Sequence, residues 1–332
     1  MTSQPSASFV GIACVLIASA LWGTTGTTAT LASGVGPLGI GAVAMGLGGL
    51  LLALTALRSI LKSRHRIAGQ WPMLVLGSLS VAIYPLAFYS SMHLAGVAIG
   101  TVISIGSAPL AASLIERFFD GQKLTTRWIL GAAAGLAGAA LLTFSESAGH
   151  GGADAQDARA VLYGILLGLL SGLLYALYSW VARRLMQAGI PPRAAMGSIF
   201  GIGGMALLPV LAATGAPLLA SWTNIAVGVY MALVPVLVAY VLFAYGLARV
   251  SATMATTLSL LEPVIAAVLA VVVVGERLPV AGWVGVGLIV GSLFILTVPI
   301  GGRRRHRDIG RSGASGAALA LATPVREGRL RR

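Results

Sequence analysis

Charged side chains are scarce in this chain. Only 9% of its 332 residues are Asp, Glu, Lys or Arg, whereas 57% are hydrophobic. A soluble domain carries about 25% charged residues, and a surface so poor in charge would not keep a globule of this size in solution. The mean hydropathy of +0.93 also excludes intrinsic disorder. The chain is therefore expected to lie mostly in lipid.

Cysteine and histidine are scarce as well. The single cysteine, Cys14, excludes an internal disulfide and a thiolate metal cluster within one chain. Metal and haem sites in helical bundles use histidines that face each other across the bundle. None of the four histidines lies midway along an apolar run; they are His65, His93, His150 and His306. We therefore expect no metal and no cofactor.

Two further functions lack their sequence patterns. The chain has no Gly-x-x-x-x-Gly-Lys-Ser/Thr pattern, so it does not hydrolyse ATP through a P-loop. The formal charge of +13 could indicate a nucleic-acid partner, but nine of the 22 Lys and Arg residues follow Gly301 and the others lie in short segments between apolar runs. Because no segment combines a basic surface with aromatic platforms, no nucleic-acid binding is expected.

Long apolar runs make up most of the sequence. A transmembrane helix needs about 20 mostly apolar residues. Ten runs satisfy this requirement, at residues 9–32, 37–57, 71–93, 97–119, 128–144, 161–182, 194–214, 225–248, 250–274 and 280–300. The first run is too long for the core of a signal peptide and has no basic segment before it. The sequence thus predicts an all-α integral membrane protein with ten transmembrane helices.

Basic residues lie almost entirely on one side of these ten spans. If the N-terminus is cytoplasmic, 20 Lys and Arg residues fall inside and only Arg159 and Arg277 fall outside. Since short cytoplasmic segments are enriched in Lys and Arg, both termini are predicted to be cytoplasmic. The protein is expected in the plasma membrane, as a multi-pass protein of a bacterial inner membrane.

The two halves of the chain resemble each other. A shift of 154 residues places Pro109 on Pro263 and the turn 121–124 on 275–278, and shifts of 153 and 156 align further aromatic residues. The nearly constant offset over five spans indicates duplication, and an odd number of spans inverts the second copy. The expected organisation is an N-terminus at 1–8, a first repeat at 9–146, an external linker at 147–160, a second repeat at 161–300 and a basic, disordered cytoplasmic tail at 301–332.

These motifs resemble the EamA family of the drug/metabolite transporter superfamily. Each five-helix copy has a proline in its fourth helix and then a Gly-(Glu/Gln)-(Arg/Lys)-Leu turn, and the stretch Leu261-Glu262-Pro263 matches best. The first copy departs from the pattern, with Ala108 before its proline and Gln122 in its turn. The resemblance implies two inverted five-helix repeats and transport of a small metabolite, amino acid, amine or drug.

Glu262 is the candidate for coupling or substrate binding. It lies 12 residues into the span 250–274 and is the only charged residue between Arg249 and Glu276. At about 1.5 Å per residue this is close to the bilayer centre, where an ionisable group by default indicates a functional site. We expect the carboxyl group to be protonated when dehydrated and to ionise when water enters. The alternative is a structural Glu that hydrogen-bonds backbone left unpaired by Pro263.

Aromatic and hydroxyl side chains supply further candidates for a substrate pathway. They are Trp22, Thr24, Thr25, Tyr84, Tyr89, Tyr240 and Tyr245. The threonines could instead bond their own helix backbone, whereas Trp180 and Tyr230 fit an interfacial aromatic belt. Pro109 and Pro263 remove helix hydrogen bonds at equivalent places and are candidate hinges, with static kinks as the alternative. Three glycine pairs or runs, around 131–135, 164–172 and 287–291, are expected to pack helices within one chain.

The predicted function is secondary active transport by alternating access, with export as the direction and proton coupling as the candidate energy source. The expected partners are a small-molecule substrate, membrane lipid and protons, in a monomer or homodimer. No Lys or Arg occupies the centre of a span, which argues against phosphorylated and dicarboxylate solutes. A channel-like facilitator is the alternative. A membrane enzyme has only the loop with Glu116, Asp120 and Lys123 to offer.

Overall fold

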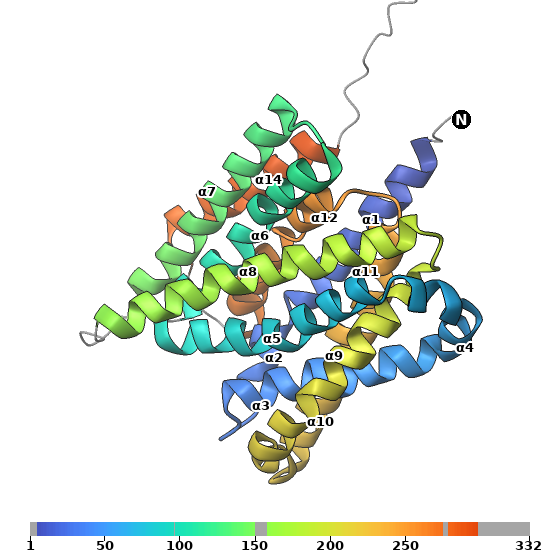
Figure 1. Cartoon of the computed structure of the whole chain (residues 1–332). Helices are drawn as coiled ribbons and strands as arrows, with labels where there is room; N and C mark the ends of the chain where they lie inside the picture. The colour runs from blue at the N-terminus through green and yellow to red at the C-terminus, as the bar shows by residue number, and fades with distance from the viewer. Residues whose placement is uncertain (1–4, 96, 150–157, 275–277, 298–332) are drawn as a thin grey trace, which may run out of the picture. The chain divides into compact units, whose positions relative to one another are not determined.

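The computed structural model describes residues 5–95, 97–149, 158–274 and 278–297 (Figure 1). Within these ranges the chain forms helices and short turns, without a strand. Nine of the described helices are long and apolar enough to cross a membrane, and the shorter apolar stretch Thr126–Leu142 occupies the place of the fifth predicted span. The prediction of an all-α membrane protein is confirmed.

The first repeat forms five spans. They are α1 (Pro5–Trp22) with α2 (Thr25–Ala29); α3 (Pro37–Ala42), the π-helical turn η1 (Val43–Leu47) and α4 (Gly48–Gly69); α5 (Trp71–Ala95); α6 (Val97–Asp120); and α7 (Thr126–Gly149). The second span runs well past its predicted end at 57, because the basic residues that follow continue the helix out of the apolar segment. The predicted linker falls mostly on residues 150–157, outside the described residues.

The second repeat forms the other five spans. They are α8 (Ala158–Gln187); α9 (Pro192–Thr214); the 3-10 turn η2 (Ala216–Leu219) before α10 (Trp222–Met231), the π-helical turn η3 (Ala232–Val238) and α11 (Ala239–Leu247); α12 (Ala252–Leu258), α13 (Leu261–Leu269) and the π-helical turn η4 (Ala270–Val274); and α14 (Val280–Thr297). Local sequence sets several starts. Pro192 opens α9, and the hydroxyl oxygens of Ser221 and Ser251 accept N–H groups at the starts of α10 and α12. The predicted tail at 301–332 lies outside the described residues.

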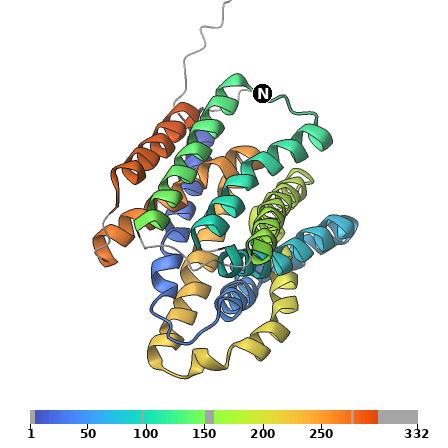
Figure 2. The ribbon, with the colours of Figure 1, turned by 90° about the vertical axis from the view of Figure 1, so that its left-hand side faces the viewer.

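Helix pairing follows the two-fold relation that inverted repeats require. The fifth span packs along the tenth (α7 on α14) and the second along the seventh (α4 on α9), so each of these pairs a helix with its own counterpart. The contact of α5 with α8 has its equivalent in that of α11 with α1. Figures 1 and 2 show α7 beside α14 from two directions. This arrangement confirms the fold of two inverted repeats.

Glycines allow several of these helices to approach closely. A Cβ at Gly138 of α7 would lie 2.7 Å from the carbonyl oxygen of Gly285 in α14, and one at Gly164 of α8 would lie 2.6 Å from the backbone nitrogen of Ala95. The prediction that glycines pack helices within one chain is therefore confirmed for those of α7 and α8. It is wrong for Gly287 and Gly291, because a Cβ at either position would have no described atom within 4 Å.

Apolar side chains also cover the outside of the bundle, as expected where lipid is the solvent. Large exposed residues such as Leu54, Leu170 and Phe294 lie on the outer helix faces. The interior contains a continuous buried cluster that extends through both repeats. Trp180 belongs to this cluster at 3% exposure, and its indole N–H donates to Asp120 at 2.9 Å. Its assignment to an interfacial belt was wrong, because that polar partner lets the ring lie inside.

Candidate functional site

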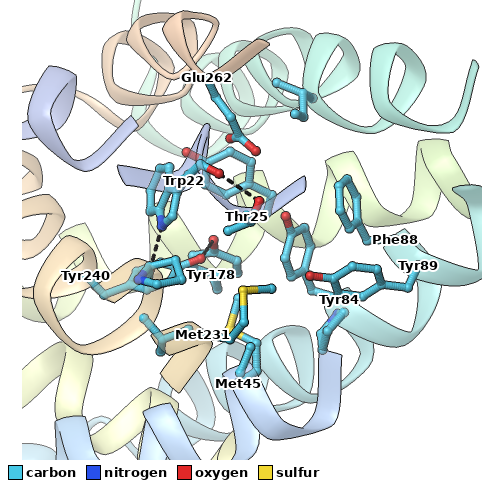
Figure 3. Close-up of a pocket in the computed structure, with 16 residues that line it drawn as sticks. Trp22, Thr25, Met45, Tyr84, Phe88, Tyr89, Tyr178, Met231, Tyr240 and Glu262 are labelled. Atoms are coloured by element: carbon cyan, nitrogen blue, oxygen red, sulfur yellow. Dashed lines mark hydrogen bonds between the residues drawn. The ribbon is translucent and has the colours of Figure 1, made fainter. Parts of the chain in front are cut away.

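A cavity of about 60 Å³ lies where the two repeats meet (Figure 3). Its wall contains seven aromatic rings, two methionines and one carboxylate in total, and these come from both repeats. These residues are Trp22, Tyr84, Phe88, Tyr89, Tyr175, Tyr178, Tyr240, Met45, Met231 and Glu262. A space of this size holds a few water molecules. A metabolite can therefore bind here only if the walls move apart.

Helix geometry explains how several rings reach the cavity. Tyr84 and Phe88 are four residues apart on α5, so they project from one face, and their rings stack with centroids 5.8 Å apart. Trp22 ends α1 and contacts Tyr240 of α11 at 5.0 Å between ring centroids. The aromatic wall is consequently a single connected cluster rather than separate side chains.

Four of the aromatic side chains have their polar atoms engaged by the protein. The Trp22 indole N–H donates to the carbonyl oxygen of Pro235 at 2.8 Å. That carbonyl belongs to the π-helical turn η3. The hydroxyl groups of Tyr178 and Tyr240 share a hydrogen bond of 2.8 Å, and that of Tyr175 donates to Ser259 at 2.9 Å. These bonds fix the rings and leave mainly their faces and edges for contact with a ligand.

Three polar groups of the lining remain without a partner among the described residues. They are the Glu262 carboxyl group and the hydroxyl groups of Tyr84 and Tyr89. Figure 3 shows the Glu262 side chain extending from α13 toward the cavity, with Met45 and Met231 on the opposite side. All three side chains are only partly buried. These three groups are thus available to water or to a bound solute.

Among the residues that the structure describes, Glu262 is the only charged one that lines the cavity. With aromatic faces around it, the site combines the two features that attract an organic cation, a carboxylate and ring quadrupoles. The described part of the wall contains no Lys, Arg or His that could hold an anion. In the described residues no group of three or more His, Cys, Asp and Glu residues could bind a metal ion.

The structure brings six of the eight predicted pathway residues to this cavity. They are Glu262, Trp22, Thr25, Tyr84, Tyr89 and Tyr240. The other two lie elsewhere. Tyr245 is 38% exposed and does not line the cavity. The Thr24 hydroxyl lies outside the lining, 2.7 Å from the Tyr230 hydroxyl and 2.6 Å from the Leu21 carbonyl oxygen.

The threonines after Trp22 mostly bond their own backbone. The Thr25 hydroxyl donates to the Trp22 carbonyl oxygen at 2.7 Å, and that of Thr28 donates to the Thr24 carbonyl oxygen at 2.9 Å. Such bonds offset the interruption between α1 and α2. The sequence allowed these threonines either to line a substrate pathway or to bond their own helix backbone. The structure shows the backbone bonds, and Thr25 also lines the cavity.

The two candidate hinge prolines have different surroundings. Pro109 lies inside the continuous helix α6. Pro263 lies in the first turn of α13, directly after the break at 259–260 that separates it from α12. A first-turn proline removes no helix hydrogen bond. The second copy is thus interrupted where the first is not, although the two sequences align there.

Sequence reasoning did not select Tyr178, Phe88, Met45 and Met231 of the lining. For Tyr175 a signal existed, because the shift of 153 residues aligns it with Trp22. The methionines carry no comparable signal, since an apolar side chain in a span most often faces lipid or the core.

Comparison with known proteins identifies the family. The sequence pattern of the EamA-like transporter family matches residues 9–144 and again residues 162–298. An uncharacterized transporter, YwfM, from Bacillus subtilis is 34% identical over 85% of this chain and 92% of its own length. The two matches of the family pattern correspond to the two halves of the described fold.

Two more distant relatives have names that include a substrate. A probable terminal-alkyne amino-acid exporter from Streptantibioticus cattleyicolor is 27% identical over 87% of this chain and 97% of its own length. The aromatic amino acid exporter YddG from Ancylobacter novellus is 25% identical over 89% and 98%. A protein of known crystal structure superposes with a TM-score of 0.71 at 23% identity, over 89% of this chain and 97% of that one, which shows a shared fold.

Proposed function

The chain belongs to the EamA-like transporter family, and on this basis we propose that it is a secondary active exporter that works by alternating access. The central observation is a small cavity between two inverted repeats with one unpartnered carboxyl group, that of Glu262. A midplane site between inverted repeats is the usual arrangement in secondary transporters. Because the cavity holds only a few water molecules, a solute fits only when the walls move apart.

The proposed substrate is a small amine or amino acid with an apolar or aromatic body. Glu262 supplies an acceptor for an ammonium group, and the rings of Tyr84, Phe88 and Tyr89 supply an apolar surface next to it. The absence of a basic residue in the lining disfavours solutes whose only charge is negative. Two relatives named as exporters of amino acids agree with this class.

Glu262 also offers a simple means of proton coupling. A carboxylate in a dehydrated cavity needs a cationic partner or a proton. If protons and the ammonium group occupy Glu262 alternately, a proton enters as the solute leaves. We propose this exchange in the plasma membrane of a bacterium, with both termini cytoplasmic, in line with the distribution of basic residues.

The two alternative functions have less support. A channel-like facilitator needs a continuous path, whereas the described cavity is small and bounded by the connected aromatic cluster. For an enzyme, the polar groups at residues 116–123, at the end of α6 and in the turn after it, would have to be free to react. Instead the Glu116 carboxylate accepts two backbone N–H groups, and Asp120 pairs with Arg184 at 2.9 Å.

Purified protein in proteoliposomes tests the proposal. We expect saturable uptake of amines or amino acids from a panel, accumulating when a pH gradient is imposed and not after an ionophore collapses it. Glu262→Gln keeps the shape but removes titration, so it should still exchange solute and fail to accumulate it. Undiminished accumulation by a folded Glu262→Gln protein would exclude coupling through this residue. Flux that does not saturate would favour the channel.

A further inference from the structure

The short helix α12 closes one end of the bundle. We call this end the basic end, defined by the turns that follow α6, α8 and α11 at residues 121–125, 188–191 and 248–251. Six of the seven α12 residues are buried, and the helix packs on α6, α8 and α1. At its far end Ser259 accepts the hydroxyl of Tyr175, which lines the cavity. Helix α12 therefore lies between the basic end and the cavity.

One side chain of the opposite repeat holds the start of this helix. The two Glu116 carboxylate oxygens accept the backbone N–H groups of Ala252 at 2.7 Å and Thr253 at 3.2 Å. Glu116 is only 1% exposed, so these donors compensate a buried carboxylate. They are also N–H groups that have no acceptor within the helix itself. The contact joins the two repeats through one side chain.

The contact has no equivalent in the other repeat. The 154-residue shift places Ala270 on Glu116, and a side chain of alanine cannot accept a hydrogen bond. The same shift places α12 on residues 98–104, which lie inside the continuous helix α6. In a pair of inverted repeats, a one-sided contact of this kind distinguishes the basic end from the opposite end.

A second cavity adjoins this contact. It measures about 280 Å³ and is lined by Glu116, Thr253, Gln122, Lys123 and Thr125, among others. A carboxylate that leaves the α12 backbone would therefore meet water, polar side chains and the Lys123 ammonium group. The cavity therefore offers the Glu116 carboxylate polar surroundings in place of its two N–H partners.

From this geometry we propose that Glu116 is the gate residue of the basic end. Its contact with α12 holds that end closed, and its release lets α12 move so that the central cavity opens there. Glu116 lies 11 residues after the cavity-lining Ile105, about 16 Å along α6. It is thus a positioning residue that does not touch the solute. The gate rests on the proposed alternating access, but it can be measured without any substrate.

Labelling of a cysteine in the cavity measures the gate. Met45→Cys on a Cys14→Ala background reports entry of an impermeant maleimide, and Lys123→Cys identifies the membrane face of the basic end. Gln keeps one acceptor oxygen, so Glu116→Gln loses one of the two hydrogen bonds and the negative charge, and it turns an amide N–H2 toward a backbone donor. Loss of one hydrogen bond to a carboxylate shifts an equilibrium by about tenfold or more. Glu116→Gln should therefore speed labelling from the basic face by about that factor, and should slow it from the opposite face.

A gate changes the two labelling rates in opposite directions, faster from the basic face and slower from the opposite face. A general loosening of the bundle would instead speed labelling from both faces. Arg193→Gln is the matched control, because it removes the Arg193 bond to the Thr55 carbonyl oxygen in the pairing of α9 with α4 and leaves α12 untouched.

Glu116→Asp, which is too short to reach both N–H groups, should shift labelling in the same direction and serves where the Gln variant does not fold. Unchanged labelling, faster labelling from both faces, or an equal effect of Arg193→Gln would overturn the proposal. A labelling shift in a protein without solute flux would instead refute the transport function alone.

Discussion

At the scale of single residues, the cavity separates side chains that shape it from side chains that are free to bind. Trp22, Tyr175, Tyr178 and Tyr240 have their polar atoms engaged in hydrogen bonds within the protein. The hydroxyl groups of Tyr84 and Tyr89 have no partner among the described residues. Chemically identical residues in one cavity therefore have different roles, decided by what each hydroxyl contacts.

Removal of a free hydroxyl should affect binding rather than stability. Tyr84→Phe and Tyr89→Phe keep the ring and delete one hydrogen-bonding group that faces the cavity. We expect KM for the transported solute to rise several-fold, equivalent to about 1 kcal/mol, with the thermal unfolding midpoint in detergent little changed. Concentration-dependent uptake measures the first and a melting curve the second. An unchanged KM in both variants would show that neither hydroxyl contacts the solute.

The converse applies to the bonded pair. Tyr240→Phe leaves the hydroxyl of Tyr178, which is 1% exposed, without its partner at 2.8 Å. An unsatisfied buried hydroxyl costs about 1–3 kcal/mol, so the unfolding midpoint should fall. The double variant Tyr178→Phe with Tyr240→Phe removes both groups and should recover part of that loss. The interpretation would be contradicted if the double variant lost more unfolding free energy than the two single variants lose together.

At the scale of elements, the site depends on interrupted helices. Helix α1 ends at Trp22, and α13 begins just after a break, so both place a helix end near the cavity. Gly23, directly after α1, lies against α13. A Cβ there would lie 2.6 Å from Cβ of Ile265 and 2.8 Å from the carbonyl oxygen of Glu262. Gly23 therefore sets how closely α13, which carries Glu262, approaches the first span.

Gly23→Ala tests this close approach. Both nearest atoms are held by the backbone of α13 and cannot swing away, so the helices must separate. We expect a loss of about 1–3 kcal/mol in stability and a displaced Glu262, seen as a lower unfolding midpoint and weaker transport. Gly26→Ala is the matched control, because its Cβ would meet no described atom within 4 Å. Equal behaviour of the two variants would refute a packing role for Gly23.

The elements also show what sequence patterns can and cannot predict here. Apolar runs of about 20 residues gave the spans, because lipid tolerates few other structures. Pro263 marked a candidate hinge or kink near this place, but the apolar run continues through Ser259 and Leu260, so the pattern did not locate the break there. Glu262 was predictable as a lone charge in such a run. Tyr178 and Met231 were not, because facing inward depends on tertiary packing that periodicity in an all-apolar helix does not encode.

At the scale of the whole molecule, two ends of the described bundle differ in chemistry. The basic end carries Lys123, the Asp120–Arg184 ion pair and Arg183, whose guanidinium donates to the carbonyl oxygens of Leu247 and Val250. At the opposite end, the connection between the repeats rests on neutral groups such as the Asn224 amide, which donates to the Ser33 carbonyl oxygen at 3.0 Å. The charged end is the one expected to face the cytoplasm.

Cysteine labelling in intact cells tests this orientation. On a Cys14→Ala background, Arg64→Cys and Lys123→Cys mark the basic end, and Thr223→Cys, at the start of α10, marks the other. On the predicted topology, 20 of the 22 Lys and Arg residues fall on the side of the basic end, so moving that end across the membrane during insertion would require many charges to cross. We expect an impermeant maleimide to react with Thr223→Cys in intact cells, and with the other two only after permeabilisation. Reaction at residue 123 in intact cells would reverse the orientation, and with it the direction assigned to the Glu116 gate.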